Sequence, residues 1–273
     1  MARWDWYQST LSDISHEKVC RLLSSSIPGT QVVPGYPKNG YLRGADITRD
    51  DERIASVWWG GNPGVHVLAS GEHSPTVCQV LRDGQVSHRI TRADACEDFI
   101  GDPELFDSMA TAFMDYASAN RIKIENQGDW HNGQSRTLYI GSRKSPVMIR
   151  LYEKGHQMGT DPTWVRLEVV VRPKGEKGFD VAEWQPGEAF GASRWLVSML
   201  ESIGWDHLKT KSIGTQWAPS DTDRARAALV RQYGATLEAW AEELGGWDQI
   251  PEAIEKVREE SQALKKMVEE LHR

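Results

Sequence analysis

The chain has 273 residues, of which 39% are hydrophobic and 26% are charged, as in an ordinary globular protein. It contains no run of eighteen apolar residues, and its first residues are acidic and aromatic, so we expect neither a membrane span nor a secretory signal. The three cysteines lie far apart in the sequence, which favours a reducing compartment and predicts a cytoplasmic protein.

The net charge of −7 is unevenly distributed along the chain. Residues 121–177 carry eleven Lys and Arg against six Asp and Glu, although the protein as a whole is acidic. A basic segment in an acidic protein is consistent with one surface that faces phosphate groups. A chance bias on a solvated face is the alternative.

The first part of the chain mixes strand and helix patterns. The expected elements are a strand over 4–11, a helix over 15–23, strands over 54–59 and 65–69, and a helix over 73–82. Between them, the Gly- and Pro-rich residues 28–44 predict loops.

The middle of the chain is richest in strand patterns. The expected elements are a strand over 88–99, an amphipathic helix over 103–119, and strands over 122–126, 136–141, 147–154 and 164–172. Because helices do not alternate with every strand, we predict an α+β fold of antiparallel sheets flanked by helices, and not a parallel doubly wound fold.

The expected domain organisation has two parts. Residues 1–205 form one unit of two sheet–helix halves, 1–87 and 88–205, and residues 206–273 form a helical tail. The last helix spans about 251–272 and has an amphipathic pattern. It either packs on its own domain or forms a dimer contact.

Acidic residues on two predicted strands are candidate metal ligands. Asp94 and Asp98 are four residues apart, so they share one strand face, and Glu168 interrupts an otherwise apolar strand whose polar face also holds Arg166 and Arg172. Carboxylates of this kind suit Mg²⁺ or Mn²⁺. The alternative is that the two aspartates sit at a solvated strand end.

A tyrosine on the strand over 147–154 is a candidate nucleophile. Arg150, Tyr152 and Lys154 share one face, so two cations flank the phenol, where they would attract a phosphate and favour the phenolate. The alternative is a structural tyrosine in a cross-strand aromatic pair. The sequence has no His-x-His pair, no GxxxxGK[ST] loop and no GxSxG elbow.

Four motifs in register together resemble the replication initiation factor family, which includes initiators of rolling-circle plasmids, filamentous-phage-type replication proteins and related relaxases. The motifs are TRADACEDF at 91–99, TLYIGSRKS at 137–145, IRLYEK at 149–154 and WVRLE at 164–168. The resemblance extends from about residue 90 to residue 172.

The resemblance implies particular roles for particular residues. The family's nucleophile falls on Tyr152, and its metal-binding acids fall on Asp94 and Glu168, with Asp98 as a candidate third ligand. Glu97 stands where relatives usually have an apolar residue, so it competes with Asp98 for that role. His156 is either an extra phosphate contact or a turn residue.

The implied activity is initiation of rolling-circle DNA replication. Tyr152 would nick one strand at an origin, forming a 5′-phosphotyrosine link and a free 3′-hydroxyl, with Mg²⁺ or Mn²⁺ as cofactor. The cations expected at the DNA phosphates are Arg143, Arg150, Lys154 and Arg166. Single-stranded or hairpin origin DNA is the expected partner, and a homodimer, a host helicase and a polymerase are further candidates.

Three other functions compete with this interpretation. A conjugative relaxase would use the same chemistry in another context. A metal-free tyrosine recombinase or topoisomerase is disfavoured, because its nucleophile usually lies on a helix. A DNA-binding regulator that keeps the fold without cutting is disfavoured by the presence of Tyr152, Asp94 and Glu168 together.

Overall fold

The computed structural model describes residues 1–205, 209–211, 213 and 221–259. Contacts divide the chain into two compact units, which we call unit 1, Met1–Thr215, and unit 2, Gln216–Arg273. The domain boundary predicted at 205/206 falls next to residues outside the described part of the chain.

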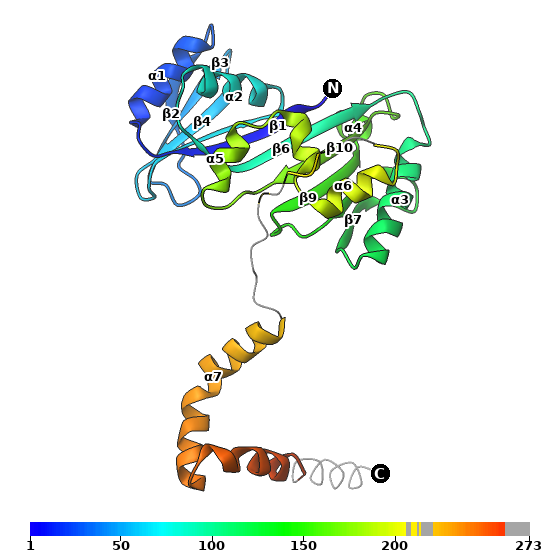
Figure 1. Ribbon diagram of the computed structural model, residues 1–273. Coiled ribbons are helices and arrows are strands. Elements are labelled where there is room, and N and C mark those ends of the chain that lie inside the picture. The colour runs from blue at the N-terminus through cyan, green and yellow to red at the C-terminus, as the bar shows by residue number, and fades with distance from the viewer. Residues whose placement is uncertain (206–208, 212, 214–220, 260–273) are drawn as a thin grey trace. The chain divides into compact units, whose positions relative to one another are not determined.

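Unit 1 is built on one antiparallel sheet of ten strands, in the order β2-β3-β4-β5-β1-β6-β10-β9-β8-β7. The strands are β1 (Arg3–Leu11), β2 (Gln31–Gly35), β3 (Arg43–Arg49), β4 (Glu52–Trp59), β5 (Val65–Ser70), β6 (Arg89–Phe99), β7 (Ile124–Asp129), β8 (Gln134–Ile140), β9 (Val147–Glu153) and β10 (Val165–Val171). The first five strands form one half of the sheet and the last five form the other, and the halves lie side by side (Figure 1).

The two halves are joined where β1 pairs with β6 in the middle of the sheet. The predicted α+β class with antiparallel strands flanked by helices is therefore confirmed, and its two halves share one continuous sheet. This joint places residues from the N-terminal strand beside the strands that carry the sequence motifs.

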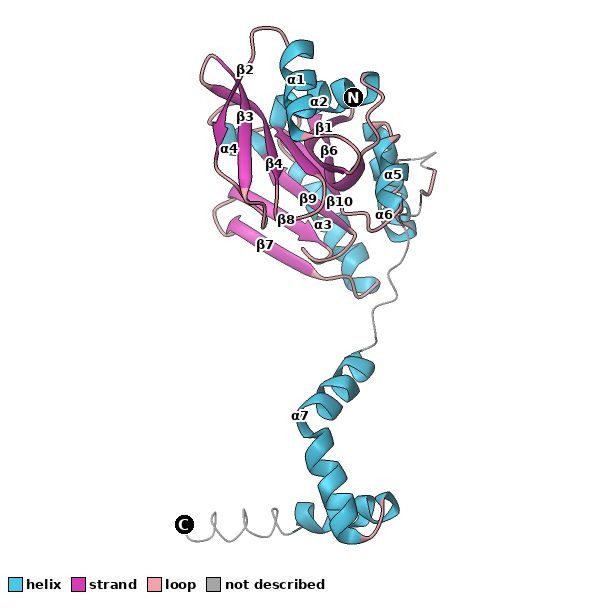
Figure 2. Cartoon of the chain, turned by 90° about the vertical axis from the view of Figure 1, so that its left-hand side faces the viewer, coloured by secondary structure: helices cyan, strands magenta, loops and turns pink. Residues whose placement is uncertain are grey.

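Helices cover the apolar face of the sheet. They are α1 (His16–Ser26), α2 (Ser74–Asp83), α3 (Leu105–Ala119), α5 (Lys177–Ala182) and α6 (Arg194–Glu201), with short 3₁₀ turns η1 (Gly71–His73) and η2 (Pro186–Gly191). α1 contacts β2, β3 and β4, α2 contacts β1 and β5, α3 contacts β7, β8 and β9, and α5 contacts β6. Figure 2 shows α5 and α6 together on one side of the strands.

The alternation of side chains along each strand gives the sheet a second, polar face. On β6, Ala93 and Ala95 belong to the buried core, whereas Asp94 and Asp98 lie on the opposite face. We call this opposite face of β6, β10 and β9 the polar face. It carries the acids, the arginines and the tyrosine that the sequence motifs single out.

Two sequence predictions fail in this unit. Residues 28–44 were expected to be loops, but they contain β2 and the start of β3, because an edge strand tolerates Pro34, whose missing N–H would interrupt a central strand. The strand predicted through Lys154 ends at Glu153, and Lys154 begins the short helix α4 (Lys154–Met158).

Unit 2 is helical where it is described. It contains α7 (Asp221–Leu244) and the 3₁₀ turn η3 (Trp247–Gln249), and residues 250–259 are helical. The helix predicted over 251–272 starts in this segment, and its residues from 260 onward lie outside the described part. Among the described residues, no helix is both long and apolar enough to cross a membrane.

A buried ion pair fixes the end of β9, next to Tyr152. The Glu153 carboxylate accepts hydrogen bonds from the backbone N–H and the guanidinium of Arg136, and the guanidinium also bonds Asp107 on α3. The Arg136 guanidinium lies 4.4 Å from the centre of the Phe106 ring. These contacts tie α3 to β8 and β9 at the point where the chain turns into α4.

We expect Arg136→Met to lower the free energy of unfolding by about 3 kcal/mol, because it leaves the Glu153 carboxylate, only 6% exposed, without its partner. Arg143→Met is the matched control, since its ion pair with Glu125 is exposed and should contribute less than about 1 kcal/mol. Urea denaturation measures both variants. Equal losses for the two would show that the Arg136 pair does not brace the sheet.

Candidate active site

The sheet register brings the motif residues together on the polar face. Arg166 of β10 lies opposite Tyr152 of β9 and opposite Asp98 of β6. One step further along the face, Glu168 lies opposite Arg150 of β9. Residues that are far apart in sequence thus form one cluster across three neighbouring strands.

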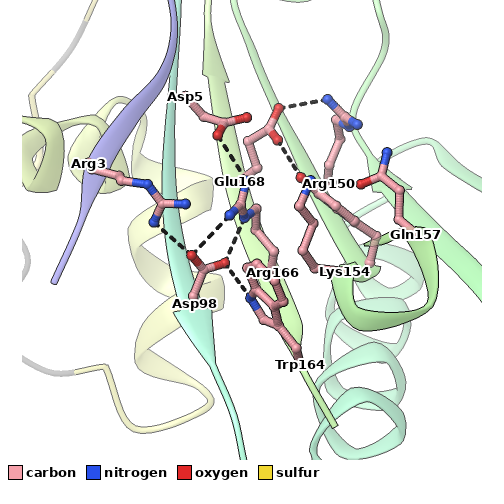
Figure 3. Close-up of polar contacts among 10 residues, drawn as sticks. Arg3, Asp5, Asp98, Arg150, Lys154, Gln157, Trp164, Arg166 and Glu168 are labelled. Atoms are coloured by element: carbon pink, nitrogen blue, oxygen red, sulfur yellow. Dashed lines mark hydrogen bonds and ion pairs between the residues drawn. The ribbon is translucent and has the colours of Figure 1, made fainter. Parts of the chain in front are cut away.

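Tyr152 and Glu168 form the centre of this cluster. The Tyr152 hydroxyl donates a hydrogen bond to Glu168 Oε2 at 3.2 Å. The Arg150 guanidinium donates to Glu168 Oε1 at 2.7 Å, and Figure 3 shows Arg150 beside Glu168. The Arg150 guanidinium carbon and the Lys154 ammonium lie 5.1 and 5.8 Å from the centre of the Tyr152 ring. The predicted flanking of the tyrosine by two cations is therefore present, although Lys154 reaches it from α4.

The expected effect of Arg150 in favour of the phenolate is present, but a larger opposing effect outweighs it. The Tyr152 side chain is 5% exposed, and this burial, reinforced by the Glu168 carboxylate, raises the pKa of the phenol above its ordinary value. The opposing effect of Arg166 and Arg150 is smaller. Desolvation outweighs the neighbouring charges, so the tyrosine is protonated in this state.

Glu168 lies in an acidic, desolvated environment. It is 1% exposed, and burial, together with the neighbouring carboxylates of Asp94 and Asp5, raises its pKa to about 7 although Arg150 opposes the shift. Asp94 is 2% exposed and accepts two hydrogen bonds from Arg92, at 2.9 and 2.5 Å. Two buried carboxylates on adjacent strands are hard oxygen donors, which fit a divalent cation.

Asp5 is a third carboxylate at this site, and sequence reasoning missed it. The pairing of β1 with β6 shifts register between Trp4 and Trp6, so Asp5 is the extra residue of a β-bulge and turns toward Arg166 and Glu168 (Figure 3). Its carboxylate accepts a hydrogen bond from Arg166 at 2.9 Å. The pairing of β1 with β6 joins residues some ninety positions apart, so no local pattern could have found it.

Asp98 has a different environment from Asp94 and Glu168. Its carboxylate accepts hydrogen bonds from Arg166 at 2.6 and 3.0 Å, from Arg3 at 2.7 Å and from the Trp164 indole at 2.9 Å. Although burial opposes ionisation, these donors lower the pKa of Asp98 to about 2. With four donors on two oxygens, the Asp98 carboxylate is saturated, which does not favour a role as metal ligand.

The remaining predicted residues lie around this centre. Arg166 is 3% exposed and is held between Asp98 and Asp5, so it faces carboxylates and not solvent. Arg143 is exposed and pairs with Glu125. Lys154 donates to Gln157 on α4.

The two residues at which the sequence departs from the family pattern lie away from Tyr152. Glu97 pairs with the N-terminal amine of Met1, and its strand position belongs to the face opposite Asp98. His156 is exposed on α4.

A second group of metal-ligand type lies in the N-terminal half of the sheet. It consists of Glu52 at the start of β4 and Glu72 and His73 in η1, with candidate ligand atoms within 4.8 Å of one another. Its two glutamates are exposed, and His73 already bonds Glu52 at 2.8 Å. None of the three contacts Tyr152 in the described part of the chain.

Comparison with known proteins gives two matches. Residues 89–184 match the family described as "Replication initiation factor". The fold is similar to that in "Structure of Rolling Circle Replication Initiator Protein from Geobacillus stearothermophilus", with a TM-score of 0.53 and 18% sequence identity over 77% of this chain and 98% of that chain. No curated protein sequence matches the chain.

The family match spans β6 to the end of α5, and it therefore contains Asp94, Tyr152 and Glu168. It covers the same stretch as the four sequence motifs, and the likeness of fold extends beyond it into the N-terminal half. The resemblance predicted from the motifs is confirmed: residues 89–184 match the replication initiation factor family.

Proposed function

We propose that this protein initiates rolling-circle replication by nicking one strand of origin DNA with Tyr152. The observation that carries the proposal is the hydrogen bond from the Tyr152 hydroxyl to the buried Glu168 carboxylate, at a site flanked by Arg150 and Lys154. A nucleophile needs a neighbouring group to accept its proton and cations to attract its anionic substrate. The family match supports the same activity.

The proposed reaction is a transesterification, in which the scissile phosphate passes from the 3′ oxygen of the DNA to the tyrosine oxygen. The Tyr152 oxygen attacks the scissile phosphorus, its proton passes to the hydrogen-bonded Glu168 oxygen, and the 3′ oxygen leaves and takes a proton from solvent. A 5′-phosphotyrosine and a free 3′-hydroxyl result. Because the link retains a phosphodiester, attack by a 3′-hydroxyl reverses the step and rejoins the strand without another energy source.

Asp94 and Glu168, with Asp5 in place of Asp98, are the residues that we propose to hold Mg²⁺ or Mn²⁺. Their carboxylates are buried or half-buried and come from three adjacent strands, and Asp94 and Asp5 help to raise the pKa of Glu168. A cation would relieve this repulsion. A bound divalent ion would supply Lewis-acid stabilisation of charge at the phosphate.

Cations of the polar face would bind the DNA backbone. Arg150 and Lys154 lie nearest to the Tyr152 ring, and Arg143 lies 4.9 Å from the Tyr139 ring on the neighbouring strand. Arginine matches phosphate geometry with paired N–H donors. Arg166 is committed to Asp98 and Asp5, so we propose that it positions these acids and does not contact DNA.

A covalent adduct tests the nucleophile. We expect the full-length protein, incubated with a labelled single-stranded oligonucleotide library and Mn²⁺, to give a protein–DNA adduct on a denaturing gel that EDTA prevents. Tyr152→Phe should abolish the adduct, since phenylalanine has no attacking oxygen.

Tyr139→Phe is the matched control for this assay. Tyr139 lies on β8, on the same sheet face as Tyr152, but its hydroxyl donates a hydrogen bond to Gln127 instead of to Glu168. It should retain the adduct. An adduct that persists in Tyr152→Phe would refute the assignment, and an adduct that forms equally well in EDTA would point to a metal-free recombinase.

Metal affinity tests the ligand set. We expect Asp94→Asn and Glu168→Gln each to weaken Mn²⁺ binding by more than about tenfold, since loss even of a group beyond the metal's direct ligands costs 10–100-fold. Asp5→Asn should also lower the affinity for Mn²⁺. Glu97→Gln is the control, since Glu97 pairs with the N-terminal amine. Calorimetric titration with unchanged Mn²⁺ affinity in both Asp94→Asn and Glu168→Gln would exclude this site.

We expect the Asp98 carboxylate to stabilise the folded protein and not to bind the metal. Its pKa is lower in the folded protein than the ordinary value of 3.8, so its contribution is complete above about pH 4 and is lost as the pH falls toward 2. We expect Asp98→Asn to lower the free energy of unfolding at pH 7 by about 2 kcal/mol and to differ less from wild type near pH 2.

Denaturation at the two pH values measures this difference, with the exposed Asp13→Asn as control. If Asp98→Asn instead removed Mn²⁺ binding and left stability intact, Asp98 would be a ligand.

A further inference from the structure

Arg172, directly after β10, is an arginine without a partner on the polar face. Its side chain is half-buried, and its Nη1 atom is buried with no hydrogen-bond acceptor. The guanidinium of Arg172 makes no hydrogen bond or ion pair with any other residue in the described part of the chain. Every other arginine of this cluster has a carboxylate partner.

Two further arginines surround this position. Arg92 lies beside Arg172 on the neighbouring strand, one step beyond the paired residues Val171 and Ala93, and Arg150 lies on the other flanking strand. The Arg92 guanidinium is paired with Asp94, and that of Arg150 with Glu168. Each acid therefore forms its ion pair with another arginine, and Arg172 has no ion pair of its own among the described residues.

An unpaired guanidinium in a half-buried position is costly, because burial removes water from its N–H donors without replacing it. Burial, together with repulsion from Arg92 and Arg150, lowers the pKa of Arg172 below its ordinary value, although Asp94 opposes the shift. A bound anion with several oxygens would satisfy these donors and remove the repulsion at the same time.

We propose that Arg172, with Arg92 beside it, binds a backbone phosphate of the DNA strand that is not the scissile phosphate. This inference rests on the proposed function and extends it by a second phosphate subsite. The subsite lies on the same face as Tyr152, because Arg166, Glu168 and Arg172 alternate along β10. Arg166 lies opposite Tyr152, and Arg172 follows it six positions further along the chain, about 20 Å away.

The position of the subsite implies a path for the strand. The DNA would run along β10 from Tyr152 toward Arg172, with the Asp94–Glu168 region between the two phosphates. Trp6 lies beside this path, with the Arg92 guanidinium 4.8 Å from its ring centre. A subsite at this distance would fix the register of the strand, so that one phosphate and not its neighbour meets the tyrosine.

The salt dependence of DNA binding tests the proposal. The probe is oligothymidylate, and the protein is the full chain carrying Tyr152→Phe, so that no covalent link forms. We expect Arg172→Gln to lower the affinity about tenfold and to reduce the slope of log K against log salt concentration by about 0.7, the value for one phosphate contact on a single strand. Arg172→Lys should keep most of the slope.

Arg21→Gln is the matched control, because Arg21 is exposed on α1, on the helix-covered side of the sheet. It should leave both affinity and slope unchanged. An affinity and slope that are also unchanged in Arg172→Gln would overturn the proposal.

A second measurement combines the Arg172→Gln variant with a change in the DNA. Oligonucleotides recovered from the adduct assay fix the register, and a neutral methylphosphonate is then placed at one position at a time. We expect a methylphosphonate at one position, away from the scissile phosphate, to lower the DNA affinity of the protein that retains Arg172 about tenfold. The same methylphosphonate should not lower the affinity of Arg172→Gln any further.

The outcomes separate the two proposals. If the adduct forms but no methylphosphonate position depends on Arg172, the arginine only offsets the charge of Asp94 and Glu168, and the subsite is wrong while the proposed function stands. If the wild-type protein neither binds oligothymidylate nor forms an adduct, both fail.

Discussion

The buried Glu168 carboxylate is the constraint on which the site depends. A carboxylate that is 1% exposed in the middle of a ten-stranded sheet is tolerated only with partners that replace water. The structure supplies the Arg150 guanidinium and the Tyr152 hydroxyl from the neighbouring strand. Because the acid needs these donors, it also holds the phenol in a fixed place. The contact that stabilises the acid is thus the one that would let it accept the phenolic proton.

The other charges of the polar face follow from the same requirement. Arg166 is held between Asp98 and Asp5, Arg92 is held by Asp94, and Arg150 is held by Glu168, so the acids of three strands all have an arginine partner. These ion pairs link β1 and β6 to β10, and they join the N-terminal half of the sheet to the half that carries the family motifs. Cleavage would require this network to exchange partners when a cation and phosphates arrive. A site built from ion pairs is suited to that exchange, whereas an apolar core is not.

The sequence predicts the second half of the fold better than the first. Alternation along 88–99, 147–154 and 164–172 predicted the strands and placed Asp94, Tyr152 and Glu168 each on the polar face of its own strand, because side-chain direction in a strand depends only on local periodicity. β2 was missed because its Pro and Gly residues look like a loop when the strand is an edge. Asp5 was missed because a bulge and a long-range pairing turn it into the site. The phenol's raised pKa was missed because burial is a property of the packed sheet and not of the flanking cations.

The most direct test of the account is to identify which amino acid carries the DNA. The adduct formed with single-stranded DNA and Mn²⁺ is digested with nuclease and trypsin, and the peptide that retains a nucleotide is sequenced by mass spectrometry. Cleavage after Arg150 and after Lys154 isolates Tyr152 in a peptide of its own, separate from that of Tyr139. The account predicts a nucleotide 5′-phosphate on Tyr152. A nucleotide on any of the other tyrosines, or on a serine, would contradict it.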